Sequence, residues 1–260
     1  MQEAMELFIS NLFSDNAVDR FYFLAVALTV VISIVLHELA HGWAAIRLGD
    51  ETPIRQGRMT GNPLVHMGPW SLLMLAVAGI AWGQMPIDRT RLRGRHGEAI
   101  VAAAGPAMNV LLALVALSVL AGLLHLWGYA GVPVELFMVD VPGSSVTSTQ
   151  GNAIKFLLLF GVTNLLLAMF NLFPVPPLDG SHIVADYSRP YADFVGDPKH
   201  QGFLLMLFVF GFLMAGRVLI AWSWWLATAW VGLLTGSVNQ TLSRRASRGR
   251  TAGRTPRGAR

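Results

Sequence analysis

The sequence predicts an all-α polytopic membrane protein, and three observations support this prediction. Hydrophobic residues make up 54% of the 260 residues, charged residues only 13%, and the mean hydropathy is +0.53. A soluble domain of this length could not bury so much apolar surface. The chain also contains several apolar runs near the length of about 20 residues that a helix needs to cross a bilayer. We therefore expect about five or six transmembrane helices in one membrane-embedded domain over residues 21–240.

Residues 1–20 are expected to lie at the membrane interface and not to form a cleavable signal. Acidic residues stand where a signal sequence carries positive charge: Glu3, Glu6, Asp15 and Asp19. The apolar residues of this stretch predict a short interfacial helix over residues 4–13.

Four apolar runs are long enough to cross the membrane at least once. Residues 21–43, 100–126 and 156–173 each suit a single helix. Residues 202–236 are too many for one crossing and are interrupted by a Gly-Arg pair that ends at Arg217. We expect two helices joined near that arginine.

A shorter apolar stretch over residues 70–82 is expected to enter the membrane and return. Pro69 and Pro86 flank it, and at 1.5 Å per residue it is too short to cross comfortably. Such non-helical backbone is tolerated where protein surrounds it. The sequence thus predicts a membrane-dipping segment around residues 57–82.

The distribution of positive charge predicts the orientation of the chain. Loops 47–68 and 86–98 contain seven arginines between them, whereas residues 127–155 contain only Lys155. By the positive-inside rule, the first two loops face the cytoplasm and the third faces outward. This assignment requires that residues 70–82 do not cross.

Residues 241–260 are expected to form a disordered basic tail. They contain seven arginines and no acidic residue, so the rest of the chain carries a formal charge of −3. We expect the tail to lie against anionic lipid headgroups. Nucleic-acid binding is the alternative, but the body offers no basic surface for it, and no nucleic-acid partner is expected.

The first long apolar run contains an H-E-x-x-H motif formed by His37, Glu38 and His41. On a helix the two imidazoles lie one turn apart on one face, and Glu38 lies where it can reach a bound water. The alternative is a membrane helix whose polar residues pair with neighbours. Three ionisable groups in five positions would then cost several kcal/mol without a purpose.

The third metal ligand is predicted to be Asp179. The chain has no cysteine, and a catalytic zinc usually has three protein ligands. Prolines at 174, 176 and 177 end the preceding helix and place Asp179 in an extended segment. If residues 70–82 do not cross the membrane, Asp179 emerges at the same membrane face as His41. If they do cross, Asp179 lies at the opposite face, roughly 30 Å from His41. A helix-ending loop outside the membrane is the alternative interpretation of these prolines.

The motifs together resemble the site-2 protease family, in particular its small bacterial and archaeal members. They cover His37–His41, Gly57–Pro63 with His66 and Pro69, Ala104–Pro106 with Asn109, and Asn171–Gly180. The resemblance implies a peptidase that cleaves transmembrane segments of other proteins, with one zinc held by His37, His41 and Asp179. One departure is Gly68, which stands where members of this subgroup often have Asp.

The predicted mechanism is hydrolysis by a zinc-activated water with Glu38 as the general base, on substrate helices that must first unwind locally. Asn171 is predicted to donate a hydrogen bond to the oxyanion or to the substrate backbone, and its alternative role is a hydrogen bond between helices. For Asn164 and Asn109 the hydrogen bond between helices is the favoured role. His66 is expected to hydrogen-bond to the backbone, and its alternative role is to flank the substrate path.

Three other functions remain open from the sequence. A catalytically silent scaffold or chaperone for transmembrane segments would need the ligands but not Glu38. A surface peptidase would need more loop than this chain has, and an ion transporter would need acidic residues near the middle of several helices. We expect an active enzyme in a bacterial or archaeal cell membrane, with its site nearer the cytoplasmic face.

Overall fold

The computed structural model describes residues 8–14, 17–138 and 148–237, and these residues form helices and no strand. Four helices are long: α1 (Ala17–Arg47), α4 (Gly97–Leu126), α5 (Ser148–Asn171) and α8 (Gln201–Thr235). Four are short: α2 (Thr52–Arg55), α3 (Pro63–Ala78), α6 (Asp179–Tyr187) and α7 (Arg189–Gly196). Short 3-10 helices are η2 (Phe8–Phe13), η3 (Arg89–Arg91), η4 (Val134–Met138) and η5 (Pro198–His200).

The predicted fold class, an all-α polytopic membrane protein, is confirmed. Four helices in the described part of the chain are long and apolar enough to cross a membrane: residues 18–47, 97–126, 148–171 and 213–235. This count is lower than the expected five or six, because the last apolar run forms fewer helices than predicted.

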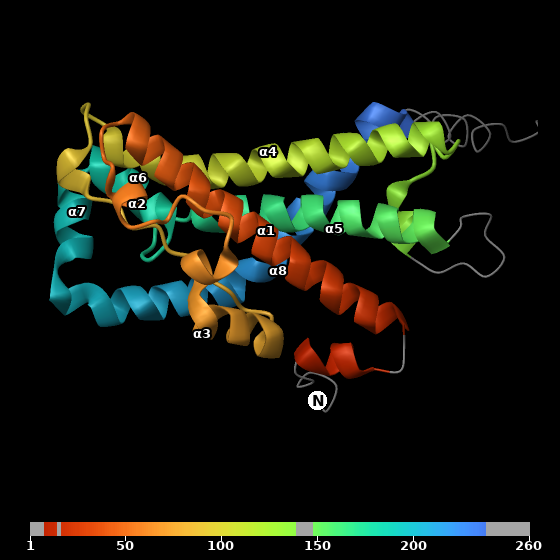
Figure 1. The fold of residues 1–260 in the computed structure, drawn as a ribbon, viewed down its shortest axis with the longest axis horizontal. Coiled ribbons are helices and arrows are strands. Elements are labelled where there is room, and N and C mark those ends of the chain that lie inside the picture. The colour runs from red at the N-terminus through yellow and green to blue at the C-terminus, as the bar shows by residue number, and fades with distance from the viewer. Residues whose placement is uncertain (1–7, 15–16, 139–147, 238–260) are drawn as a thin grey trace, which may run out of the picture.

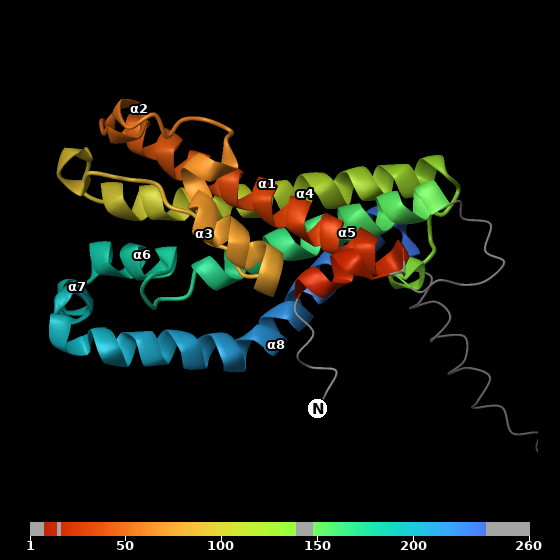
Figure 2. The ribbon, with the colours of Figure 1, turned by 60° about the horizontal axis from the view of Figure 1, so that its bottom comes forward.

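The predicted break near Arg217 is wrong. Helix α8 is continuous over its 35 residues, and Gly216 and Arg217 both lie within it. A glycine inside a helix costs only about 1 kcal/mol, and this run contains no proline that would force a break. At 1.5 Å per residue α8 is about 52 Å long, so it exceeds the thickness of the hydrocarbon core. Figure 2 shows it running from the end of α7 towards α5.

The chain after α3 turns back, as expected of a segment that does not cross. Helix α3 has only 16 residues, is kinked at Gly68 (φ 69°, ψ 170°) and ends at Gly79 in the left-handed conformation. The returning segment is held against α3, because the Ser71 hydroxyl bonds to both the N–H and the carbonyl of Trp82. Farther along, the Gln84 N–H donates to the His66 carbonyl over 3.0 Å.

Helix α4 is the centre of the bundle. It packs against α1, α5, α6 and α8, and Figures 1 and 2 show α1, α4 and α5 side by side. The core between α4 and α5 is aliphatic and closely packed, since a Cβ at Gly161 would overlap the side chain of Leu117. Small residues permit such close approach of helices in membranes, where lipid provides no hydrophobic drive for association.

The ends of the chain leave two predictions open. The basic tail over residues 241–260 lies outside the described residues. Helix η2 falls within the interfacial helix expected over residues 4–13, and its place at the membrane interface stays a prediction.

Candidate metal centre

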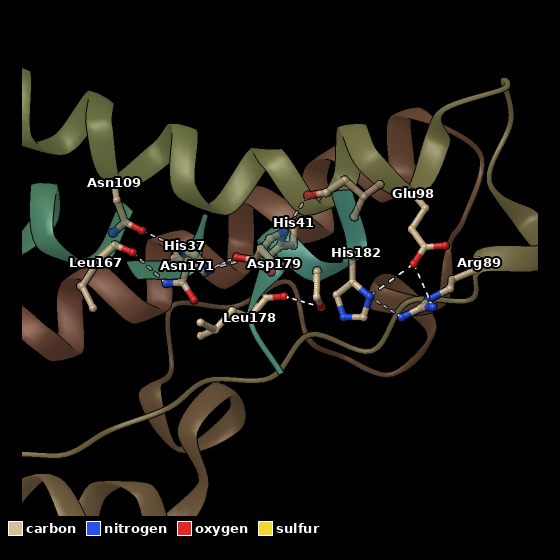
Figure 3. A network of polar contacts seen from close by, with 12 residues as sticks. His37, His41, Arg89, Glu98, Asn109, Leu167, Asn171, Leu178, Asp179 and His182 are labelled. Carbon is tan, nitrogen blue, oxygen red and sulfur yellow. Dashed lines mark hydrogen bonds and ion pairs between the residues drawn. The ribbon is translucent and has the colours of Figure 1, made fainter. Parts of the chain in front are cut away.

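Two helices and one loop bring His37, His41 and Asp179 together, as the sequence predicted. His37 and His41 lie one turn apart on α1 and are 7% and 5% exposed. Their Nε2 atoms are 3.0 Å apart. Asp179, the first residue of α6, places one carboxylate oxygen 3.1 Å from Nε2 of His37 and the other 3.4 Å from Nε2 of His41. Figure 3 shows the three side chains converging between α1, α4 and α6.

A tight loop between α5 and α6 positions Asp179. Leu178 is extended (φ −77°, ψ 152°), and α6 begins at the residue that follows. The loop folds so closely onto itself that a Cβ at Gly180 would overlap the carbonyl oxygen of Leu172. Glycine after the aspartate is therefore a requirement of the loop.

A chain of hydrogen bonds fixes which nitrogen of His37 carries its hydrogen. The Phe160 carbonyl can only accept, so Asn164 presents its amide N–H to it over 2.9 Å. The Asn164 oxygen then accepts from the Asn109 amide over 2.9 Å, which leaves the Asn109 oxygen facing Nδ1 of His37 at 2.6 Å. Nδ1 of His37 must therefore be the donor, and in the neutral imidazole, the form that binds a metal, its Nε2 presents a lone pair to the site.

His41 is oriented in the same way by a different partner. Its Nδ1 lies 2.7 Å from the Val101 carbonyl, which can only accept. In the neutral imidazole the hydrogen of His41 is therefore on Nδ1, and its Nε2 presents a lone pair to the site.

This arrangement fits a bound cation, and zinc in particular. Two lone pairs and a carboxylate face one another at 3.0 to 3.4 Å, which is favourable only with a positive charge between them. Ligands at 2.0–2.1 Å from a tetrahedral zinc lie roughly 3.3 Å apart. Asp179 Oδ2 is buried without a hydrogen-bond partner. Gly105 on α4 leaves the space free, because a Cβ there would overlap Nε2 of both histidines.

Glu38 is buried beside the two histidines, at 7% exposed. The segment returning from α3 packs directly on it: a Cβ at Gly83 would overlap Oε1 of Glu38 and approach Ile34. The absence of a side chain at position 83 is what lets this segment approach the Glu38 carboxylate.

The remaining polar residues take varied places. Asn164 and Asn109 bond to each other between α5 and α4, the interhelical role that was favoured for them. Asn171 donates to the Leu167 carbonyl of its own helix over 3.0 Å. His66 bonds to the Thr60 carbonyl over 2.7 Å, its favoured role.

Sequence reasoning missed an ionic cluster beside the site. Glu98 at the start of α4 pairs with Arg89 at 2.8 Å and lies 3.4 Å from His182 on α6 (Figure 3). It joins the loop after the returning segment to the helix that carries Asp179. His182 is far from Arg89 and Glu98 along the chain, and no sequence pattern links the three residues.

Comparison with known proteins gives a consistent answer. The sequence pattern of peptidase family M50 matches residues 25–215. YwhC of Bacillus subtilis, provisionally named a zinc metalloprotease, is 31% identical over 201 residues, which is 74% of this chain and 85% of that relative. No solved structure gives a significant match.

Two further relatives are mycobacterial proteins named Rip2, also provisionally zinc metalloproteases. The protein of Mycolicibacterium smegmatis is 29% identical over 184 residues, and that of Mycobacterium tuberculosis 28% over 191 residues. The matches cover 68% and 69% of this chain but only 62% and 64% of those relatives. With a family match over most of its length and a metal-binding geometry to suit, this chain belongs to peptidase family M50, the site-2 protease family of zinc metalloproteases.

Proposed function

We propose that this protein is an intramembrane protease that hydrolyses peptide bonds within or near transmembrane segments of other proteins. His37, His41 and Asp179 hold one zinc per chain, and Glu38 is the general base. The observation that carries this proposal is the convergence of two bare imidazole lone pairs and a carboxylate on a buried face of α1, a helix able to cross a membrane.

The proton-transfer role falls to Glu38. Zinc, when bound, lowers the pKa of a coordinated water and polarises the scissile carbonyl. Glu38 adjoins the ligand His37 in sequence and is buried with it, so it accepts the proton of the attacking water and passes it to the leaving amine. Burial of Glu38 under the returning segment excludes bulk water from this transfer.

Asn171 is proposed to stabilise the developing oxyanion. One of its amide hydrogens bonds to Leu167, and its second makes no bond to any other described residue. Asn171 is the last residue of α5 and is drawn together with the metal-site residues in Figure 3, so this N–H is proposed to reach a substrate carbonyl near the metal site.

A substrate must pass the segment that covers Glu38. A helix offers no free carbonyl, so the substrate unwinds before it is cleaved. The segment over residues 79–88 lies against Glu38 through Gly83 and is held to α3 by few bonds. We propose that an unwound substrate strand aligns beside this segment.

The active site is proposed to lie nearer the cytoplasmic face of a bacterial or archaeal cell membrane. Helix α1 ends at Arg47, six residues beyond His41, and arginine-rich loops follow on the same side of the chain. The lipid bilayer and transmembrane proteins are the expected partners, and the basic tail is proposed to contact anionic headgroups.

Cleavage by the reconstituted protein tests this function. A panel of single-span substrates in proteoliposomes is incubated with the wild type, with Glu38→Gln and with Glu51→Gln, whose glutamate is exposed and paired with Arg55. We expect cleavage by the wild type and the Glu51 variant, and loss of at least about 100-fold in Glu38→Gln with zinc retained. Stoichiometric zinc without cleavage of any substrate would favour the scaffold function instead.

A further inference from the structure

A polar cavity lies on the other side of the segment that covers Glu38. It has a volume of about 220 Å³, is open to solvent on one side, and is lined by the loop around Arg58, by His66 and Gly68, and by Trp82 and Gln84. Gly83 contacts Glu38, whereas its two neighbours in the chain line this cavity. The returning segment therefore separates the cavity from the metal centre, and nothing in the proposed hydrolysis uses it.

Arg58 gives the cavity an uncompensated positive charge. Its guanidinium donates one hydrogen bond to the Val65 carbonyl and makes no ion pair with an acidic residue in the described part of the chain. A guanidinium has five N–H donors in a planar fork that suits phosphate oxygens. Gly68 adds no side chain, and a Cβ there would meet open space.

His66 adds an acceptor that lacks a partner. Its Nε2 must carry the hydrogen, because it bonds to the Thr60 carbonyl, which can only accept. Its Nδ1 is buried with no hydrogen-bond partner, and the residue is only 2% exposed. A buried acceptor without a partner is costly, so a ligand that donates a hydrogen bond to Nδ1 would be favoured.

Exposed tryptophans beside the cavity indicate that it lies at a membrane interface. Trp82 on its rim is 50% exposed, and Trp70 nearby on α3 is 73% exposed. Tryptophan is enriched at the level of lipid headgroups. Helix α3 and the returning segment form a hairpin, here called the α3 hairpin. Farther along it, Leu73 and Ile80 are exposed and apolar, as expected of side chains that contact acyl chains.

We propose that this cavity binds the headgroup of an anionic phospholipid that carries a hydroxyl group, such as phosphatidylglycerol. The phosphate accepts hydrogen bonds from Arg58, and the hydroxyl donates to Nδ1 of His66. The ligand bridges the loop of Arg58 and the α3 hairpin. Within that hairpin the Gln84 N–H donates a hydrogen bond to the His66 carbonyl. It thereby fixes the hairpin, and the segment that covers Glu38, at the membrane surface.

Binding of short-chain lipids to the purified, zinc-loaded full chain tests this proposal. The probes are the dioctanoyl forms of phosphatidylglycerol, phosphatidylmethanol and phosphatidylcholine, together with glycerol 3-phosphate. Affinity is read from the lipid dependence of Tm and from native mass spectrometry. We expect phosphatidylglycerol to bind most tightly, with phosphatidylmethanol, which has the charge but no hydroxyl, weaker by about three- to tenfold.

Two variants assign the contacts. Arg58→Gln should weaken phosphatidylglycerol binding by about tenfold or more, whereas Arg55→Gln, at the nearby end of α2 but exposed and paired with Glu51, should not change it. His66→Phe should bind phosphatidylglycerol and phosphatidylmethanol equally. Zinc content equal to that of the wild type shows that each variant is folded.

Three results would overturn the proposal. Equal binding of phosphatidylglycerol by the wild type and Arg58→Gln would remove the phosphate contact. Equal affinity for glycerol 3-phosphate and phosphatidylglycerol would assign the cavity to a soluble phosphate ester. Competition by an acidic peptide, without binding of any phospholipid, would assign it to a protein partner.

Discussion

Asn109 Oδ1 lies 2.6 Å from Nδ1 of His37 and ties the helix that bears the histidines to the central helix α4. Both residues are buried, and Asn109 is itself held by Asn164 on α5. The orientation of His37 is therefore set by a chain of bonds through three helices that ends on a backbone carbonyl.

Removing this support should weaken zinc binding without removing a ligand. In Asn109→Leu, His37 loses its acceptor and is free to rotate, so zinc affinity is expected to fall by about 10- to 100-fold. A chelator competition titration measures it. Asn109→Asp, which keeps an acceptor oxygen for His37, should recover most of the affinity. Equal zinc affinity of the Leu variant and the wild type would show that Asn109 has only a packing role.

Gly105 is predicted to be essential because it leaves room for the metal. In Gly105→Ala the new methyl group would occupy the space at Nε2 of His37 and His41, so zinc content should fall well below one per chain. Gly122→Ala on the same helix is the matched control, since a Cβ there meets nothing within 4 Å. Zinc content is measured on both purified variants. Full zinc occupancy in Gly105→Ala would contradict the assignment of the metal position.

Gly83 is predicted to affect catalysis and not metal binding. A methyl group there would press on Glu38 and Ile34, and would move either the base or the segment that covers it. We expect Gly83→Ala to lower kcat by about tenfold or more while one zinc is retained. Gly61→Ala, in a loop where a Cβ meets nothing within 4 Å, should cleave at the wild-type rate. A Gly83→Ala enzyme with unchanged kcat would exclude this contact from the catalytic geometry.

Much of the site was predictable because its spacing carries its chemistry. His37 and His41 fall on one helix face by their separation alone. Asp179 was found by combining the count of ligands with the side of the membrane to which each apolar run leads. The return of the chain after α3 followed from the shortness of residues 70–82, which cannot span the hydrocarbon core.

Other features depend on packing that periodicity does not describe. The break expected at Arg217 is absent because an exposed arginine and a glycine continue a helix at small cost. The bond between Asn109 and Asn164 depends on how α4 and α5 are rotated about their axes, and the contact between Gly83 and Glu38 depends on how the returning segment lies on α1. Such relations appear only once the helices are placed in space.

Zinc content of the purified protein tests the central claim most directly. The wild type, Glu38→Gln, Asp179→Ala and the exposed-residue control Asp193→Ala are purified, loaded with zinc, freed of excess metal and compared by mass spectrometry. We predict one zinc per chain in the wild type, in Glu38→Gln and in Asp193→Ala, and strongly reduced zinc in Asp179→Ala. A folded wild-type protein that retains no zinc, or an Asp179→Ala variant that binds it as tightly as the wild type, would contradict the account.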